Sequence, residues 1–78
     1  MATWTKPYCG VQHLNELTGG IRQITLTNYG PLESGGDLVE VWALGPQGFT
    51  PIWKDKASTV AEAQAKGEAY ARSMGCLK

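Results

Sequence analysis

The only histidine of the chain, His13, is the first residue to consider for catalysis. It is followed by Asn15 and Glu16 in a stretch that we expect to form a short helix. A general base needs an orienting partner and a reacting group within reach. The sequence offers His13 no Ser/His/Asp order, no paired carboxylates and no metal-ligand spacing. We therefore predict a surface histidine, in a protein that is not an enzyme and uses no cofactor.

The two cysteines, Cys9 and Cys76, lie near opposite ends of the 78-residue chain. Two thiols and one histidine are too few for a structural zinc site unless carboxylates or a second chain contribute, so we predict no metal. In a reducing cytosol the thiols stay free. A disulfide between them would close a long loop and add about 4 kcal/mol by the loop-entropy estimate. The sequence leaves both alternatives open.

The aromatic residues in the middle of the chain carry the strongest functional signal. Residues 37–44 include β-branched and aromatic residues and indicate a strand. Residues 45–48 (Gly-Pro-Gln-Gly) are typical of a turn, and residues 49–54 return as a second strand. If Leu44 lies opposite Phe49 across this turn, alternation puts Trp42, Phe49 and Trp53 on one face. An exposed aromatic patch with a polar rim is typical of a protein contact.

The other face of this hairpin is aliphatic, and we expect the C-terminal helix to cover it. A further strand is predicted at residues 21–28, and its Ile24 and Leu26 join the aliphatic side chains of the hairpin. The aliphatic set is Ile24, Leu26, Val39, Val41 and Ile52. Covering the aromatic face instead would press Gln23 and Glu40 under the helix, and an unpaired buried polar group costs about 1–3 kcal/mol. The predicted protein-binding site is therefore the aromatic face with its polar rim: Trp42, Trp53, Phe49, Gln23, Thr25, Thr27 and Glu40.

The sequence does not decide what covers this aromatic face, nor whether Glu40 is buried. One candidate cover is the N-terminal arm with the short helix, through Trp4, Tyr8, Leu14 and Leu17; otherwise the face is free for a partner, wholly or in the part that the arm leaves open. Glu40, opposite Trp53 in the predicted pairing, is either a buried acid with a raised pKa or a half-exposed glutamate.

The C-terminal helix is predicted by its capping residues and its charge pairs. Thr59 and Glu62 form a capping-box pattern, and Gly75 suits the left-handed position after a helix. Two pairs of opposite charge, Glu62 with Lys66 and Glu68 with Arg72, have the favourable i,i+4 order. The inward stripe consists mostly of small residues, which predicts a helix lying close to the sheet.

Together these segments predict an α+β fold with the order α-β-β-β-α. We expect one domain over residues 1–78, with an N-terminal arm at 1–8, a short helix at 10–18, a three-stranded antiparallel sheet within 21–54 and the long helix at 59–74 packed on one face. The connection 29–36 is rich in glycine and proline and is expected to be a loop.

The charge balance narrows the class of partner. The chain has 7 Lys plus Arg and 7 Asp plus Glu, so its formal net charge is zero. Binding to phosphate backbones depends on clustered lysine and arginine, so this balance argues against nucleic acid. No apolar run approaches the length of a membrane span, and residues 1–6 have no apolar signal core. We expect a cytoplasmic protein that does not bind membranes.

The order helix, three strands, helix, with Leu14-Asn-Glu-Leu17 in the first helix, resembles a double-stranded-RNA-binding domain. That family has a lysine cluster at the start of its last helix, where this chain has Asp55-Lys-Ala-Ser-Thr-Val-Ala61. The resemblance therefore implies the fold and not the RNA contacts.

The size and plan of the chain, without a catalytic set, look like the small accessory proteins of phages and mobile elements. Anti-CRISPR proteins that inhibit type I effector complexes are the best-known group among them. They share no common sequence signature, so no residue carries over. The resemblance implies binding to a host protein complex in the host cytoplasm, which blocks DNA recognition or nuclease recruitment.

We therefore expect a non-enzymatic protein that uses its aromatic face for a protein target, for a homodimer, or for both. Its mechanism would be steric occlusion. The alternative is a small nucleic-acid-binding module in which the same aromatic side chains stack on bases.

Overall fold

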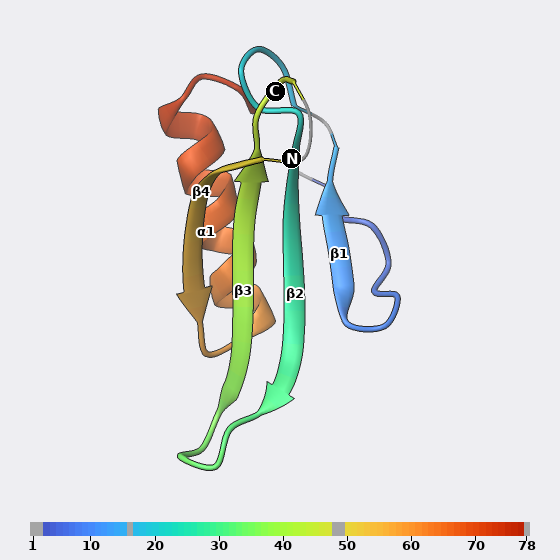
Figure 1. The fold of residues 1–78 in the computed structure, drawn as a ribbon, viewed down its shortest axis with the longest axis vertical. Coiled ribbons are helices and arrows are strands. Elements are labelled where there is room, and N and C mark those ends of the chain that lie inside the picture. Colours follow the sequence, from blue (N-terminus) through green and yellow to red (C-terminus); the bar gives the residue numbers. More distant parts are fainter. Residues whose placement is uncertain (1–2, 16, 48–49, 78) are drawn as a thin grey trace.

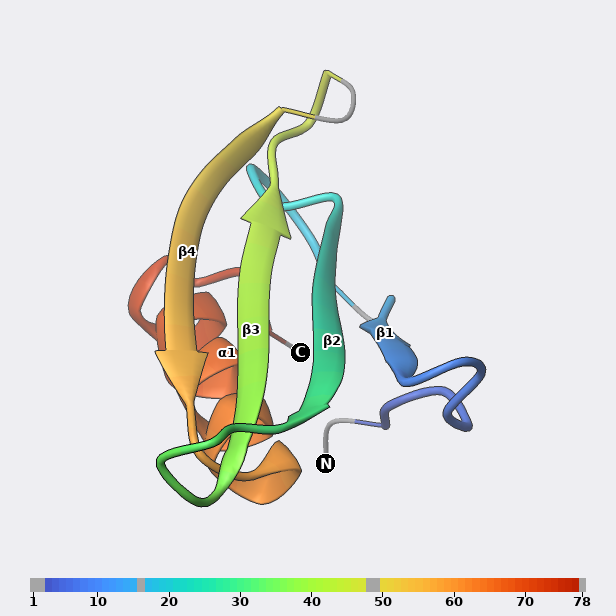
Figure 2. The same ribbon diagram turned by 60° about the horizontal axis from the view of Figure 1, so that its bottom comes forward.

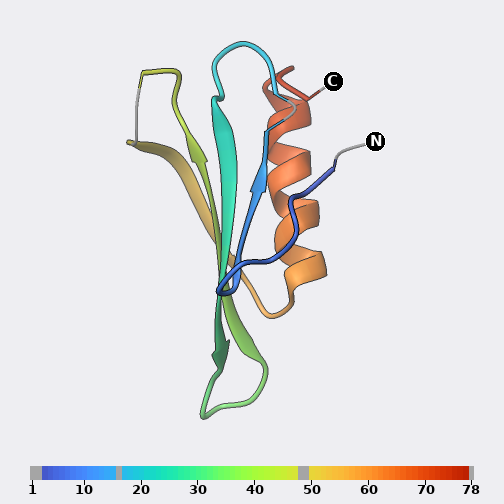
Figure 3. The same cartoon turned by 90° about the vertical axis from the view of Figure 1, so that its right-hand side faces the viewer.

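The architecture is one antiparallel sheet with a single helix laid on one of its faces (Figures 1 and 3). The computed structural model describes residues 3–15, 17–47 and 50–77. Within these, the elements are β1 (Val11–Leu14), β2 (Gln23–Pro31), β3 (Asp37–Leu44), β4 (Pro51–Ala57) and α1 (Val60–Ser73), with strand order β1-β2-β3-β4. The predicted α+β class is confirmed. The predicted three strands and N-terminal helix are wrong.

The segment predicted as a short helix is instead the strand β1. Its burial alternates: Gln12 and Leu14 point to the helix side, and Val11 and His13 point away from it. A tight turn precedes the strand at Cys9 and Gly10, whose φ angles are 51° and 76°. So short a segment is a poor isolated helix, whereas β2 offers it a full row of backbone partners. Pairing with the edge of β2 therefore makes this segment a strand, although the spacing of its apolar residues is also compatible with a helix.

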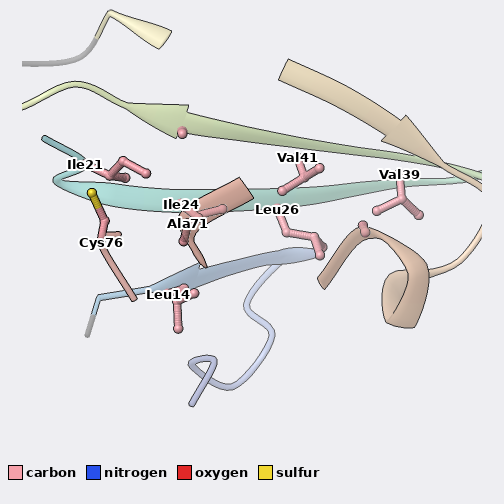
Figure 4. Packing of buried hydrophobic residues seen from close by; sticks show 10 residues of the cluster. Leu14, Ile21, Ile24, Leu26, Val39, Val41, Ala71 and Cys76 are labelled. Atoms are coloured by element: carbon pink, nitrogen blue, oxygen red, sulfur yellow. The ribbon is translucent and has the colours of Figure 1, made fainter. Parts of the chain in front are cut away.

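The core lies between α1 and the aliphatic side of the sheet. The side chains of Leu14, Ile24, Leu26, Val39 and Val41 have no exposed surface (Figure 4). This confirms four members of the predicted aliphatic set.

The helix α1 meets this layer with small residues, Ala63, Gly67 and Ala71. A Cβ built on Gly67 would lie 3.1 Å from Ile24 Cγ2 and 3.2 Å from Val41 Cγ2. The predicted close approach of helix and sheet is therefore confirmed.

The ends and surface of α1 follow the predicted pattern. The Thr59 side chain caps the helix by accepting the Glu62 N–H at 3.0 Å. The Glu62 carboxylate reaches back to the N–H of Ser58, one residue before the cap. Both charge pairs form, Lys66 with Glu62 at 3.8 Å and Arg72 with Glu68 at 3.4 Å.

The register of the β3–β4 hairpin differs from the predicted one. Ala43 lies opposite Trp53, an odd number of residues beyond the predicted partner Thr50, and a β-bulge separates Ala43 from Leu44. An odd shift moves the side chains of residues 53–57 to the other face, whereas Pro51, beyond the bulge, pairs with Leu44 and stays beside Trp42. Trp53 therefore points to the helix side, and Ile52 is not covered by the helix but 47% exposed. The predicted face of Trp53 and the predicted burial of Ile52 are wrong.

The N-terminal arm lies along the outer edge of β1, on the helix side (Figure 3). The Thr5 N–H donates to the His13 carbonyl at 2.9 Å, and the Trp4 indole N–H donates to Glu68 on α1 at 2.9 Å. Tyr8 is 81% exposed. The described part of the arm thus leaves the other face of the sheet uncovered, and the alternative in which it closes that face is wrong.

Candidate functional site

The side of the sheet that faces away from α1, which we call the open face, is defined by cross-strand pairing. One row across the four strands is His13, Thr25, Trp42 and Lys54, and the neighbouring row is Val11, Thr27, Glu40 and Lys56. Residues opposite each other in a sheet share a face. The open face therefore gathers side chains from every strand of the sheet.

The half of the open face over β1 and β2 is polar and internally hydrogen-bonded. His13 Nδ1 lies 3.3 Å from Thr25 Oγ1, and the Thr25 hydroxyl lies 3.4 Å from Gln23 Oε1. The Gln23 amide in turn donates to Asn15 Oδ1 at 2.7 Å. Thr25 is only 5% exposed and its hydroxyl is already engaged, which does not suit a nucleophile. This half of the face is satisfied by its own contacts.

The half over β3 and β4 contains a hollow of about 280 Å³. The side chains around it are Tyr29, Glu40, Trp42, Pro51 and Lys54. Val41 and Asp55 also line it, and we assign them the floor because their side chains belong to the helix side of the sheet. The hollow combines two aromatic rings with one carboxylate and one ammonium group.

A β-bulge places Tyr29 at this hollow. The pairing of β2 with β3 shifts between Asn28 and Gly30, which leaves Tyr29 as the extra residue. Gly30 adopts a φ of 93°, and its N–H donates to Asn28 Oδ1 at 2.9 Å. Tyr29 is 58% exposed. Bulges often re-aim a side chain beside a functional site.

Tyr29 and Glu40 form the polar contact of the hollow. A hydrogen bond from the phenol to the Glu40 carboxylate raises the pKa of Tyr29 above its ordinary value; smaller contributions come from desolvation and from the charge of Glu40. Glu40 is half-buried, which agrees with the second of the two alternatives for this residue.

The predicted site residues separate into three groups. Trp42, Glu40, Thr27, Thr25 and Gln23 lie on the open face, as predicted, but Gln23 and Thr25 belong to its polar half. Trp53 lies on the other side, and Phe49 falls outside the described residues.

The Trp53 ring stacks on Tyr70 of α1, with centroids 4.5 Å apart and planes 9° from parallel. It therefore extends the core and does not contribute to the open face.

Sequence reasoning missed Tyr29, which was assigned to a loop. The signal was present: a glycine at position 30, directly after the strand pattern and next to Tyr29, often marks a bulge. Tyr29 replaces Trp53 as the second aromatic side chain of the face.

Metal binding finds no support in residues 3–15, 17–47 and 50–77, where no group of three or more His, Cys, Asp or Glu could hold an ion. Cys9 is exposed and Cys76 is buried, and both are free thiols. Of the two alternatives for the cysteines, the structure therefore has the unbridged one. No helix in the described part of the chain is long and apolar enough to cross a membrane.

Comparison of the chain with protein-family models, with curated proteins and with solved structures finds no match. Its function must therefore be argued from the geometry of the open face.

Proposed function

We propose that this protein is a non-catalytic binding protein that occludes a protein partner through its open face. The observation that carries the proposal is the uncovered hollow between Tyr29 and Trp42. The helix, the arm and the C-terminal residues that the structure describes all pack on or beside the opposite face.

The chemistry of the hollow suits a protein contact. Tyrosine and tryptophan are enriched among the residues that dominate binding energy, because they supply a large contact area with few rotatable bonds. Glu40 and Lys54 border these rings and supply one charge of each sign. Opposite charges fix the orientation of a partner more than they add affinity. A protein segment that carries an apolar side chain and a polar flank fits this surface.

A host protein complex, with the type I CRISPR effector complex as the candidate, follows from the size and plan of the chain and remains a prediction. Binding would block DNA recognition or nuclease recruitment by steric occlusion. A second copy of the chain is another occupant of the same face, and would make the free protein a homodimer.

The test is co-purification with a type I effector complex and with bacterial lysate proteins. Tyr29→Ala and Trp42→Ala should each reduce capture at least tenfold, as hot-spot residues do. Tyr8→Ala is the matched control, because Tyr8 is an exposed tyrosine outside the open face. Equal capture by all four proteins would contradict the proposal. Loss of a dimer in sizing of Trp42→Ala would identify the second copy as occupant.

One observation favours a second candidate function, the binding of single-stranded nucleic acid. Lys54 and Lys56 lie on the same face as Trp42 and Tyr29, so the face has both a stacking platform and positive charge. The neutral charge of the whole chain argues the other way. Binding of an oligonucleotide that weakens steeply between low and high salt would support this candidate. Binding that is indifferent to salt would exclude it.

A further inference from the structure

The two edges of the sheet are treated differently by the fold. The outer edge of β1 is paired with the N-terminal arm through bridges at Trp4 and Tyr8 and the bond from Thr5 to His13. The outer edge of β4 lies at the opposite side of the sheet, with no described strand beside it (Figure 2). An uncovered edge is a template for another strand unless side chains block it.

Side chains block the β4 edge at one position. The Lys56 N–H donates to Asp55 Oδ1 at 2.7 Å, and the Lys56 carbonyl accepts from Lys66 Nζ at 2.6 Å. These backbone groups therefore point outward, away from β3. Lys66 also forms an ion pair with Asp55 at 3.6 Å, so one lysine of α1 holds the whole block in place.

The block does not extend to Lys54. Hydrogen-bonding direction alternates along a strand, and the register is regular from Trp53 to Ala57, so the N–H and C=O groups of Lys54 point outward like those of Lys56. No turn, loop or side-chain hydrogen bond among the described residues closes them. Ile52 lies at the bulge, where this alternation is interrupted. The backbone of Lys54 is therefore free to pair with an added strand.

The side chains of this edge indicate what kind of strand can be added. Ile52, Lys54 and Lys56 are exposed, and Lys54 and Lys56 point to the open face. Neither Lys54 nor Lys56 forms an ion pair with any described residue. The carboxylate of β4, on Asp55, is on the helix side and is already paired with Lys66. A strand beside β4 therefore meets two unpaired ammonium groups and one aliphatic side chain.

These charges disfavour a second copy of the chain at this edge. Antiparallel pairing of two copies about Lys54 or Asp55 puts lysine opposite lysine, and like charges in that position destabilise a sheet. An acidic strand reverses the sign of the same interactions.

We infer that the outer edge of β4 binds an extended acidic segment of a protein partner as a fifth strand. Lys54 supplies backbone hydrogen bonds to this segment. Lys54 and Lys56 select aspartate or glutamate at alternate positions of the segment. Strand addition of this kind takes affinity from backbone bonds and specificity from alternate side chains. The inference does not depend on the proposed role of the Tyr29–Trp42 hollow.

The test uses the whole chain and a display library of random nine-residue peptides. Selection should enrich acidic residues two positions apart. On binding of an enriched synthetic peptide, the amide proton of Lys54 should become at least tenfold slower in hydrogen exchange. Peptides without the acidic alternation, unchanged exchange at this amide, or no enrichment at all would overturn the inference. Protection that rises with protein concentration alone would assign the edge to a second copy and overturn it as well.

Two matched pairs of variants separate the backbone from the charge. Lys54→Pro removes an outward N–H together with the charge of Lys54, and should weaken peptide binding at least tenfold more than Lys54→Ala, which keeps the N–H. Lys56→Glu should weaken binding roughly tenfold, whereas the same charge change at Lys6→Glu should not. Loss of binding in Trp42→Ala but not in Lys54→Pro would place the peptide in the hollow and overturn the edge site.

Discussion

Gly67 offers the sharpest test of how α1 lies on the sheet. A Cβ at this position would lie 3.1 Å from Ile24 Cγ2, 3.2 Å from Val41 Cγ2 and 3.4 Å from the Trp4 ring. Ile24 and Val41 have no exposed surface and belong to the two central strands. Close-packed side chains cannot move aside without displacing their own neighbours. Gly67→Ala therefore adds a methyl group where there is no space for it.

Two effects of opposite sign decide the outcome of Gly67→Ala. Alanine favours a helix interior over glycine by about 1 kcal/mol. Overpacking a filled core costs about 1–3 kcal/mol, and we take about 2 because the methyl meets two immobile side chains. The expected result is a net loss of about 1 kcal/mol in the free energy of unfolding. For a domain of this size that lowers Tm by roughly 4–8 °C.

The assay is denaturant unfolding of Gly67→Ala beside Ala65→Gly. Ala65 is exposed on the same helix, so Ala65→Gly measures the helix-propensity effect without the packing effect. We expect both variants to be less stable than the parent. If Gly67→Ala instead gained as much stability as Ala65→Gly lost, the methyl group would meet no resistance. The close contact of α1 with β2 and β3 would then be wrong.

Three further predictions concern Tyr29, Trp53 and Thr59. The pKa of Tyr29 is raised in the folded state, so the contact with Glu40 stabilises the protein below pH 10, and this stabilisation is lost as the pH rises through the folded-state pKa. In unfolding measured as a function of pH, Tyr29→Phe should therefore flatten the fall in stability above pH 10. Trp53→Ala removes the stack on Tyr70 and should lower the free energy of unfolding by about 2–3 kcal/mol in denaturant unfolding, with partner capture unchanged. Thr59→Ala removes the cap of α1 and should lower the free energy of unfolding by about 1 kcal/mol in the same assay.

The long helix and the aliphatic face could be predicted because their signals are local. Thr59, Glu62 and Gly75 mark the helix ends within a few residues of one another, and the alternation of Ile24 and Leu26 is contained in one strand. The polar residues that would otherwise be buried decide which face the helix covers. Each of these inferences depends on neighbours in the chain and not on pairing across it.

The face of Trp53 could not be predicted, because it depends on register. The Gly45 N–H bonds to the Thr50 carbonyl at 3.3 Å, and a bulge follows between Ala43 and Leu44. Bulge and turn together decide whether the shift is odd or even, and composition does not specify either. The odd shift puts Trp53 on the helix side and Lys54 on the open face, and the bulge leaves Ile52 exposed. Shift and bulge together account for the wrong placement of Trp53 and Ile52.

The strand β1 was missed for a related reason. Val11 and Leu14 have helical spacing, but Gln12 and Leu14 also alternate, and four residues cannot distinguish the two periods. Residues 11–14 form a strand because they pair with the outer edge of β2 and because the turn at Cys9 and Gly10 brings them alongside it. Neither lies within the segment itself.

The open face and the open edge meet at Lys54. Its side chain borders the hollow with Tyr29 and Trp42, and its backbone points out of the sheet beside Ile52. The polar half of the open face satisfies its own hydrogen bonds, and the arm covers the β1 edge. The hollow and the β4 edge are the two surfaces without such cover, and both lie at the β4 side of the sheet. A strand added to β4 would extend the floor of the hollow and place its own side chains on the open face beside Lys54 and Lys56. One partner segment could thus contact both surfaces, because the sheet leaves them adjacent.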